Sequence, residues 1–164
     1  MHVEDLLIRF VGAWEVEDSV CNQMASELEA SGHVVREKPI PKGEVWNRML
    51  ASSWLLVLQQ DFPLQIPAKL YEYISTKRPL LLLGDEGATK SLIDNYKLGV
   101  CCPNDVEKIK QAIRNLKSSE TAFAPDDASF FDYRNISHKV ANVLDDAIAI
   151  QDSSFLDTPL RSPN

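Results

Sequence analysis

Two patterns of hydrophobic and polar residues alternate along the first two thirds of the chain. Short apolar runs bounded by Gly or Pro are typical of strands buried on both faces, and the stretches between them repeat apolar residues every three or four positions, as amphipathic helices do. The predicted strands cover residues 6–11, 33–36, 54–58, 80–83 and 99–102. This alternation predicts an α/β fold with a Rossmann-like, mostly parallel sheet of about five strands flanked by helices.

Capping residues predict where some of the helices begin and end. Asp18 or Ser19 can cap the first helix, and Gly32 stands where a left-handed residue would end it. Asn104 and Glu107 have the spacing of a capping box ahead of the helix that follows the fifth strand. These signals support the helix assignments independently of the apolar pattern.

The carboxyl-terminal part of the chain predicts a long last helix. Residues 117–128 form a polar connection, and apolar positions at helical spacing then continue from about 130 to 150. Residues 151–164, rich in Ser, Pro and Asp, are predicted to be a disordered tail. The expected organisation is one domain over residues 1–150, followed by this tail.

Composition and charge narrow the classes of partner. The 164 residues carry a formal charge of -7, which weighs against binding to nucleic acid or to an acidic membrane surface. No apolar run has the roughly 18 to 20 residues of a membrane span, so no direct membrane insertion is expected. The odd number of cysteines, Cys21, Cys101 and Cys102, without CxxC spacing, favours reduced thiols and a cytoplasmic location.

The strongest candidates for chemistry lie in the helix that begins at Pro67. A proline suits the first position of a helix, and Lys69 and Glu72 share one side of the first turn. The free N–H groups of a helix start and a lysine attract phosphate, while a carboxylate can accept hydrogen bonds from a pair of ribose hydroxyls. This combination suits a nucleotide; the alternative is an ordinary ion pair on the surface.

Glycine turns supply the remaining candidates. Gly84, Glu86 and Gly87 lie in the turn after the fourth strand, where backbone amides can approach a diphosphate closely, and Gly12 ends the first strand and can leave room for a ligand. The spacing is that of neither a dinucleotide-binding fingerprint nor a P-loop. We see no metal-ligand spacing and no catalytic triad, so the catalytic residues are unassigned and no cofactor is expected.

The central motif resembles a signature of known enzymes. The run IPAKLYEYI at residues 66–74, followed by KRPLLLLG at 77–84, is similar to the GK-x-x-EY-x-x-x-x-x-P signature in the carboxyl-terminal domain of GT-B fold glycosyltransferases. The likeness is greatest to the retaining enzymes of polysaccharide biosynthesis, and it extends from about Leu6 to Leu144. Ala68 stands where the pattern often has Gly, and Leu64 where many relatives have a second glutamate.

The resemblance implies roles for the candidate residues. The glutamate that matches Glu72 binds the nucleotide ribose, and the turn at 84–87 lies beside the diphosphate and the sugar. The chain would be the donor-binding half of a glycosyltransferase that moves a hexosyl group from a nucleoside-diphosphate sugar to a saccharide or lipid-linked acceptor. Nothing beyond that donor would be needed as a cofactor.

The resemblance also implies that parts are missing. An amino-terminal acceptor domain, or a second protein chain, would be required for turnover, and the first central strand of the sheet would precede the strand at 6–11. We therefore expect either that this strand pairs with the strand at 54–58 or that a partner supplies the remainder.

Two other functional classes are compatible with the fold. The first is a non-catalytic module that docks a partner protein, since fold does not fix function. The second, a signalling receiver or a flavodoxin-like redox domain, is less favoured, because the end of the first strand, Phe10-Val11-Gly12-Ala13, has neither an acidic cluster nor a hydroxyl-rich phosphate loop.

Overall fold

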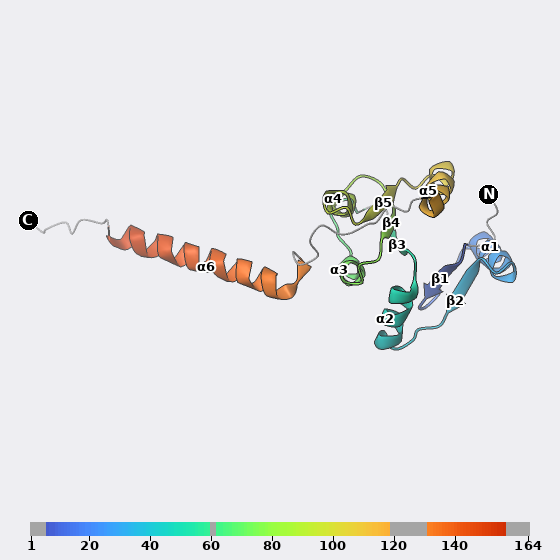
Figure 1. Ribbon diagram of the computed structural model, residues 1–164, viewed down its shortest axis with the longest axis horizontal. Coiled ribbons are helices and arrows are strands. Elements are labelled where there is room, and N and C mark those ends of the chain that lie inside the picture. Colours follow the sequence, from blue (N-terminus) through green and yellow to red (C-terminus); the bar gives the residue numbers. More distant parts are fainter. Residues whose placement is uncertain (1–5, 60–61, 119–130, 157–164) are drawn as a thin grey trace, which may run out of the picture. The chain divides into compact units, whose positions relative to one another are not determined.

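The computed structural model describes residues 6–59, 62–118 and 131–156 (Figure 1). Within them the strands are β1 (Ile8–Val11), β2 (Val34–Glu37), β3 (Leu55–Leu58), β4 (Leu80–Leu83) and β5 (Gly99–Cys102). The helices are α1 (Ser19–Ala30), α2 (Lys42–Ala51), α3 (Ala68–Ser75), α4 (Ala88–Asn95), α5 (Val106–Ser118) and α6 (Tyr133–Leu156). The predicted α/β class, parallel strands and long carboxyl-terminal helix are confirmed.

The strands form two parallel sheets instead of one. β1 pairs with β2, with Ile8 opposite Val34, and the second sheet has the order β3-β4-β5, with Leu55 opposite Leu80 and Leu80 opposite Gly99. Of the two alternatives expected from the sequence, the pairing of the first strand with the third, β1 with β3, is therefore wrong. Among the described residues, no strand pairing joins the two sheets.

Most of the buried core surrounds β4. On one face of the three-stranded sheet, Leu80 and Leu82 are almost fully buried, as are Leu70 and Ile74 of α3 and Ile93 of α4. Apolar runs without charge allow both faces to be covered, as parallel sheets require. Figure 1 shows α3 and α4 on one side of β3–β5 and α5 on the other.

The second face of this sheet packs against α5. Leu81 and Cys102 form a buried cluster with Ala112 of α5, and partly buried Leu56 and Ile109 pack against it. Cys101 and Cys102 therefore point to opposite faces of β5, as the alternation of strand side chains predicts. All three cysteines are free thiols, also as expected.

Local capping explains the bounds of α1. The Asp18 carboxylate accepts a hydrogen bond from the Cys21 N–H at 2.7 Å, as predicted for a cap. At the other end Gly32 has a φ of +79°, its N–H donates to the Glu29 carbonyl, and the His33 N–H donates to the Leu28 carbonyl. This pair of bonds is a Schellman motif, which confirms the predicted left-handed glycine.

The cap of α5 differs from the prediction. Asp105, and not Asn104, accepts the hydrogen bond from the Lys108 N–H, at 2.9 Å. Both residues are capping types, and an N-cap bonds the backbone two or three positions ahead, so the choice depends on which residue ends the preceding turn. The sequence places the helix start correctly to within one residue.

The chain divides into two compact units, residues 1–124 and 125–164. The last helix belongs to the second unit, and the predicted extent of the domain over residues 1–150 stays a prediction. α6 also continues through Leu156, into the segment predicted to be a disordered tail. Residues 157–164 of that predicted tail lie outside the described residues.

Candidate functional site

The candidate site is built from two loops that follow adjacent parallel strands. The loop after β3 and the turn after β4 both lie at the carboxyl edge of the sheet, where ligands bind in α/β folds. They are joined directly: the Ala88 N–H donates to the Pro63 carbonyl at 2.6 Å, and the Thr89 hydroxyl donates to the Gln65 carbonyl at 3.0 Å. Thr89 is almost fully buried, so this contact is an internal joint between the loops.

The glycines of the turn are required by this joint. A Cβ at Gly84 would lie 2.7 Å from the Gln59 carbonyl oxygen, and one at Gly87 would lie 2.5 Å from the Pro63 carbonyl oxygen. The two positions therefore allow one loop to approach the other closely. This is a structural reason for both glycines, additional to the predicted contact with a diphosphate.

Three helices of the first unit begin without a side-chain cap, α2 after β2 of the two-stranded sheet and α3 and α4 after β3 and β4. α2, α3 and α4 start after Pro41, Pro67 and Gly87, and none of these residues has a side chain that bonds the helix N–H groups. α1 and α5, by contrast, are capped by aspartates. The open N–H groups and the positive dipole ends of the three uncapped helices favour anionic groups.

Lys69 and Glu72 lie on the exposed side of α3, opposite the buried Leu70 and Ile74. The Glu72 carboxylate does not pair with Lys69. Instead it lies 3.2 Å from the Nζ of Lys42, the first residue of α2. The Glu72 side chain is 48% exposed and that of Lys42 is 88% exposed, so this ion pair contributes only about 0 to 1 kcal/mol and leaves the carboxylate accessible.

Lys42 is a site residue that the sequence analysis missed. Its signal was available: it follows Pro41 at the start of a helix that comes after a strand, the same arrangement that singled out Lys69. The ion pair brings the start of α2 close to the first turns of α3. Two lysines and one carboxylate therefore share this part of the surface.

Glu86 is turned toward α4. Its carboxylate lies 3.1 Å from the Nζ of Lys90, which also contacts Asp94 at 3.0 Å. The hydrogen bonds that Lys90 donates to Asp94, and then to Glu86, raise the pKa of Lys90. Lys90 therefore stays protonated and offsets the negative charge of the turn. The backbone N–H groups of the turn are then better suited to bind a phosphate.

Gly12 lies apart from these loops in the sequence, at the end of β1. It has a φ of +142°, a region that favours glycine, and no described atom lies within 4 Å of where its Cβ would be. The predicted open space at this position is therefore present among the described residues. No contact of the described residues joins Gly12 to Lys69 or Glu72.

Lys77 and Arg78 lie between the end of α3 and the start of β4, at the edge of the sheet opposite the candidate site. The Arg78 guanidinium donates to the Leu50 carbonyl at 2.5 Å, in the last turn of α2. A cation at a helix carboxyl end complements the dipole. The helix that Arg78 complements is α2, although Arg78 follows α3 in the sequence.

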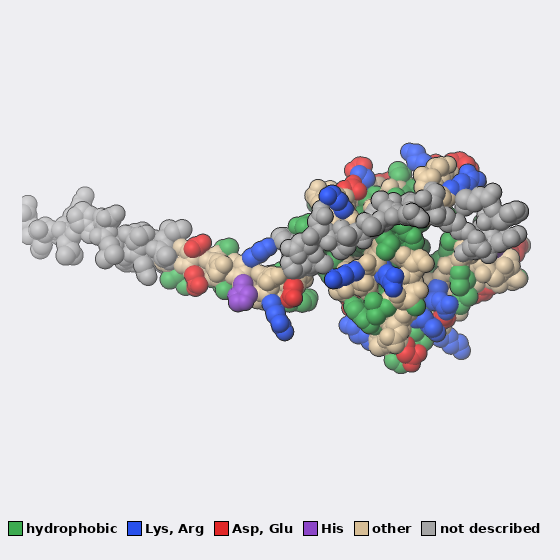
Figure 2. Space-filling view, viewed as in Figure 1, with side chains coloured by type: hydrophobic (Ala, Val, Ile, Leu, Met, Phe, Trp, Pro, Cys, Tyr) green, Lys and Arg blue, Asp and Glu red, His purple; other side chains and the backbone are tan. Residues whose placement is uncertain are grey.

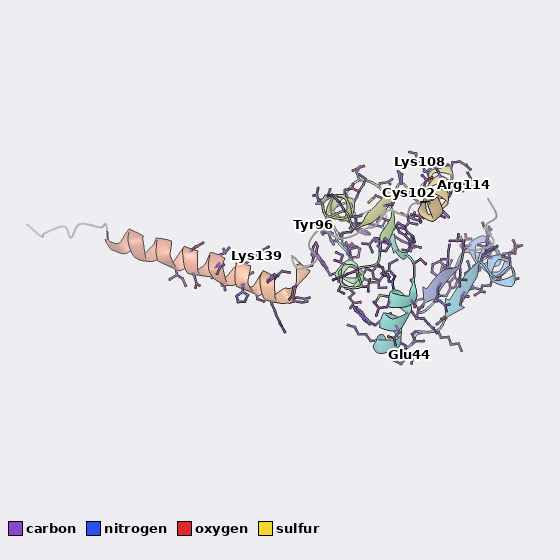
Figure 3. All side chains as sticks on the ribbon, viewed as in Figure 1. Glu44, Tyr96, Cys102, Lys108, Arg114 and Lys139 are labelled. Atoms are coloured by element: carbon purple, nitrogen blue, oxygen red, sulfur yellow. The ribbon has the colours of Figure 1, made fainter. Side chains whose placement is uncertain are left out.

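A separate cavity of about 360 Å³ lies between β5 and α5. Cys102 and Lys108 line it from these two elements, and both are labelled in Figure 3. None of the predicted site residues lines it. Burial, and then Asp94, raise the pKa of the neighbouring Cys101 to about 12, so this thiol is not a nucleophile near neutral pH.

Comparisons of the chain with models of protein families, with curated proteins and with solved structures give no match. The geometry of the candidate site is therefore the evidence on function. In the part of the chain that the structure describes, no helix combines the length and the hydrophobicity needed to cross a membrane. Among these same residues, no three His, Cys, Asp or Glu side chains form a group that would hold a metal ion.

Proposed function

We propose that this chain is the donor-binding part of a hexosyltransferase that uses a nucleoside-diphosphate sugar. The observation that carries the proposal is the Lys42–Glu72 pair, which brings the uncapped start of α2 to α3, together with the uncapped starts of α3 and α4 after β3 and β4 of the three-stranded sheet. Such a place offers N–H donors and positive charge to a diphosphate, and a carboxylate to a ribose.

Each group has a role in the proposed complex. The Glu72 carboxylate accepts hydrogen bonds from the ribose 2′- and 3′-hydroxyls, while Lys69 and the N–H groups at the start of α4 face the diphosphate. During hexosyl transfer the bond between the sugar and the diphosphate breaks, and preorganised N–H donors and cations stabilise the charge on the departing diphosphate. The acceptor and the rest of the cleft come from a further domain or chain, and the complete enzyme acts in the cytoplasm.

Calorimetric titration with UDP, GDP and ADP tests the proposal. We expect weak binding of at least one of them, and about tenfold or greater weakening in Glu72→Ala, because a hydrogen bond to a charged group contributes about 1.5 to 3 kcal/mol. The 2′-deoxy form of the nucleotide that binds should also bind more weakly than the ribonucleotide. This preference should disappear in Glu72→Ala if the carboxylate contacts the ribose.

Lys42→Ala is the matched control. It breaks the same ion pair but keeps the carboxylate, so this variant should bind nucleotide at least as well as the original chain. If Lys42 itself contacts phosphate, the affinity falls, but the preference for the ribonucleotide over the 2′-deoxy form survives. If neither variant changes the binding, or if no nucleotide binds, Glu72 is part of an ordinary surface ion pair and the proposal fails.

A second candidate function is a non-catalytic module that docks a partner. The observation in its favour is the apolar surface of the first unit: Val20, Met24 and Leu28 of α1 are exposed at a spacing of four residues. Co-purification of a partner by a chain that ignores nucleotides would favour this candidate over the first.

A further inference from the structure

Four strands of the first unit, β1, β2, β3 and β5, each have one edge without a partner among the described residues. β1 is bonded only to β2, and β3 only to β4. The N–H groups of Ile8 and Gly12 donate to β2 and its neighbour His33, and those of Leu55 and Gln59 donate to β4 and its neighbour Pro79.

Successive residues of a strand present their N–H groups to opposite sides. The N–H groups of Arg9, Val11, Leu56 and Leu58 therefore point to the open edges of β1 and β3. No hydrogen bond of the described residues satisfies them. Both edges offer the regular row of donors and acceptors that another strand would need.

β3 lacks the features that protect natural edge strands. β3 has the sequence Leu-Leu-Val-Leu, without a charge, a proline or a bulge. β2, which ends the other sheet, carries Arg36 and Glu37. Charged residues and prolines are the usual means of preventing edge pairing, so β2 resembles a true edge and β3 resembles an interior strand.

The charge on β1 is neutralised within its own sheet. Arg9 forms an ion pair with Glu37 of β2, and the other residues of β1 are Ile8, Phe10 and Val11. An occupant of the open edge of β1 would thus meet apolar side chains and no unpaired charge. A strand that is itself uncharged and apolar fits both edges.

The helices of this unit also leave apolar side chains uncovered. α1 buries only Ala25, while Val20, Met24 and Leu28 are exposed, and Leu50 of α2 is 37% exposed. Parallel strands are covered by helices on both faces. An added strand would provide the apolar surface that such helices normally cover.

We propose that an extended, uncharged apolar segment of another polypeptide inserts between β1 and β3 and runs parallel to both. The two sheets then become one, in the order β2-β1-segment-β3-β4-β5. A second copy of the chain does not fit, because two identical edges related by a twofold axis pair in antiparallel fashion and satisfy only one edge of each copy. The proposal does not depend on nucleotide binding.

Residue-resolved amide exchange in the isotope-labelled full chain tests the insertion. The probe is a synthetic peptide with an alternating Val-Ile centre and a Lys at each end. Without it, the amides of Arg9, Val11, Leu56 and Leu58 should exchange much faster than those of Phe10 and Val57. With it, all four should slow together by about tenfold or more, because both edges gain ladder hydrogen bonds.

Several outcomes would overturn the proposal. Protection of β1 alone or β3 alone would show simple edge pairing, and no protection would show that the edges accept no strand. Protection that rises with chain concentration in the absence of peptide would identify a second copy as the occupant. A paramagnetic label at one end of the peptide must broaden signals at the same end of β1 and β3, either at both beginnings or at both ends. Broadening at the beginning of one strand and the end of the other would exclude the parallel arrangement.

Leu58→Pro and Val57→Pro form a matched pair of variants. Proline at Leu58 removes a donor that faces the open edge, whereas proline at Val57 removes a bond to β4. The first variant should fold and lose the protection of Arg9 and Val11 by peptide, and the second should unfold. Full protection of Arg9 and Val11 by the peptide in Leu58→Pro would overturn the proposed insertion. If this variant does not fold, amide exchange in the unmodified chain still decides between the outcomes.

Discussion

Gly99 is the position with the least room for a side chain in the described structure. A Cβ built there would lie 1.9 Å from the Leu80 carbonyl oxygen, in the ladder between β4 and β5. The closest atoms belong to the backbone, so no side-chain rotation can relieve the contact. The glycine is needed for close approach of two strands and not for a positive φ.

This contact predicts the effect of one methyl group. Gly99→Ala should lower the free energy of unfolding by about 3 kcal/mol or more, because the strands must separate or the ladder must distort. Gly43→Ala is the control: nothing lies within 4 Å of its Cβ position, and alanine in a helix is favoured over glycine by roughly 1 kcal/mol. Urea unfolding of both variants measures the difference, and equal stability of Gly99→Ala and the original chain would contradict it.

The candidate site shows what residue types predict and what they leave open. The sequence identifies Lys69 and Glu72 as exposed residues of one helix, and the structure places them so. It does not predict that Glu72 pairs with Lys42, because that contact joins helices separated by a strand. Spacing within one helix determines a shared face, whereas the packing of helices determines the partner.

Individual elements follow the sequence closely where the signal is local. The apolar runs at 80–83 and 99–102 are strands with those bounds, and the caps of α1 are formed by the predicted residues. The pairing of strands is not local. β1 and β3 have similar apolar patterns, and nothing in either pattern shows that the two strands do not pair with each other.

The cap of α1 predicts a dependence on pH at the scale of one helix. The backbone N–H of Cys21 donates to the Asp18 carboxylate and holds the pKa of Asp18 below its ordinary value of 3.8. A lowered pKa in the folded state means that the cap stabilises α1 above that ordinary value and is lost as the pH falls through the native pKa. Amide protection of α1 should therefore decrease below a pH of about 4.

Two variants separate this effect from general acid denaturation. Asp18→Asn keeps an accepting oxygen at the cap but does not titrate, so the additional loss of protection in α1 at acid pH should disappear. Asp18→Ala should show weakened protection of α1 at every pH. An acid response of α1 in Asp18→Asn equal to that of the original chain would assign the effect to other carboxylates.

At the scale of the whole molecule, the described residues of the second unit include an apolar stripe of their own. Ile136, Val140, Val143 and Leu144 of α6 are exposed along one stripe, and Figure 2 shows hydrophobic and charged side chains interspersed on this helix. A helix with such a stripe gains most of its stability from packing on another surface. Both units therefore have exposed apolar side chains among the described residues.

The first unit should also differ in stability between its two sheets. The side chains that are almost fully buried, among them Leu70, Leu80, Leu82 and Ile93, belong to β4 and its helices. In the β1–α1–β2 segment only Ala25 and Val34 are buried, and less completely. Opening free energies follow local burial, so the sheet with the larger core should open last.

Native-state amide exchange at low denaturant concentrations measures this difference. The amides of β4 that bond to β5 should have the highest opening free energies, and those of β1 that bond to β2 should open at distinctly lower free energy. Leu82→Ala should lower the protection of β3–β5 by about 2 to 5 kcal/mol, the cost of a cavity in a packed core, and reduce that of β1–β2 much less. Equal opening free energies in both sheets would show one cooperative unit, in which β1 and β3 support each other without any inserted strand.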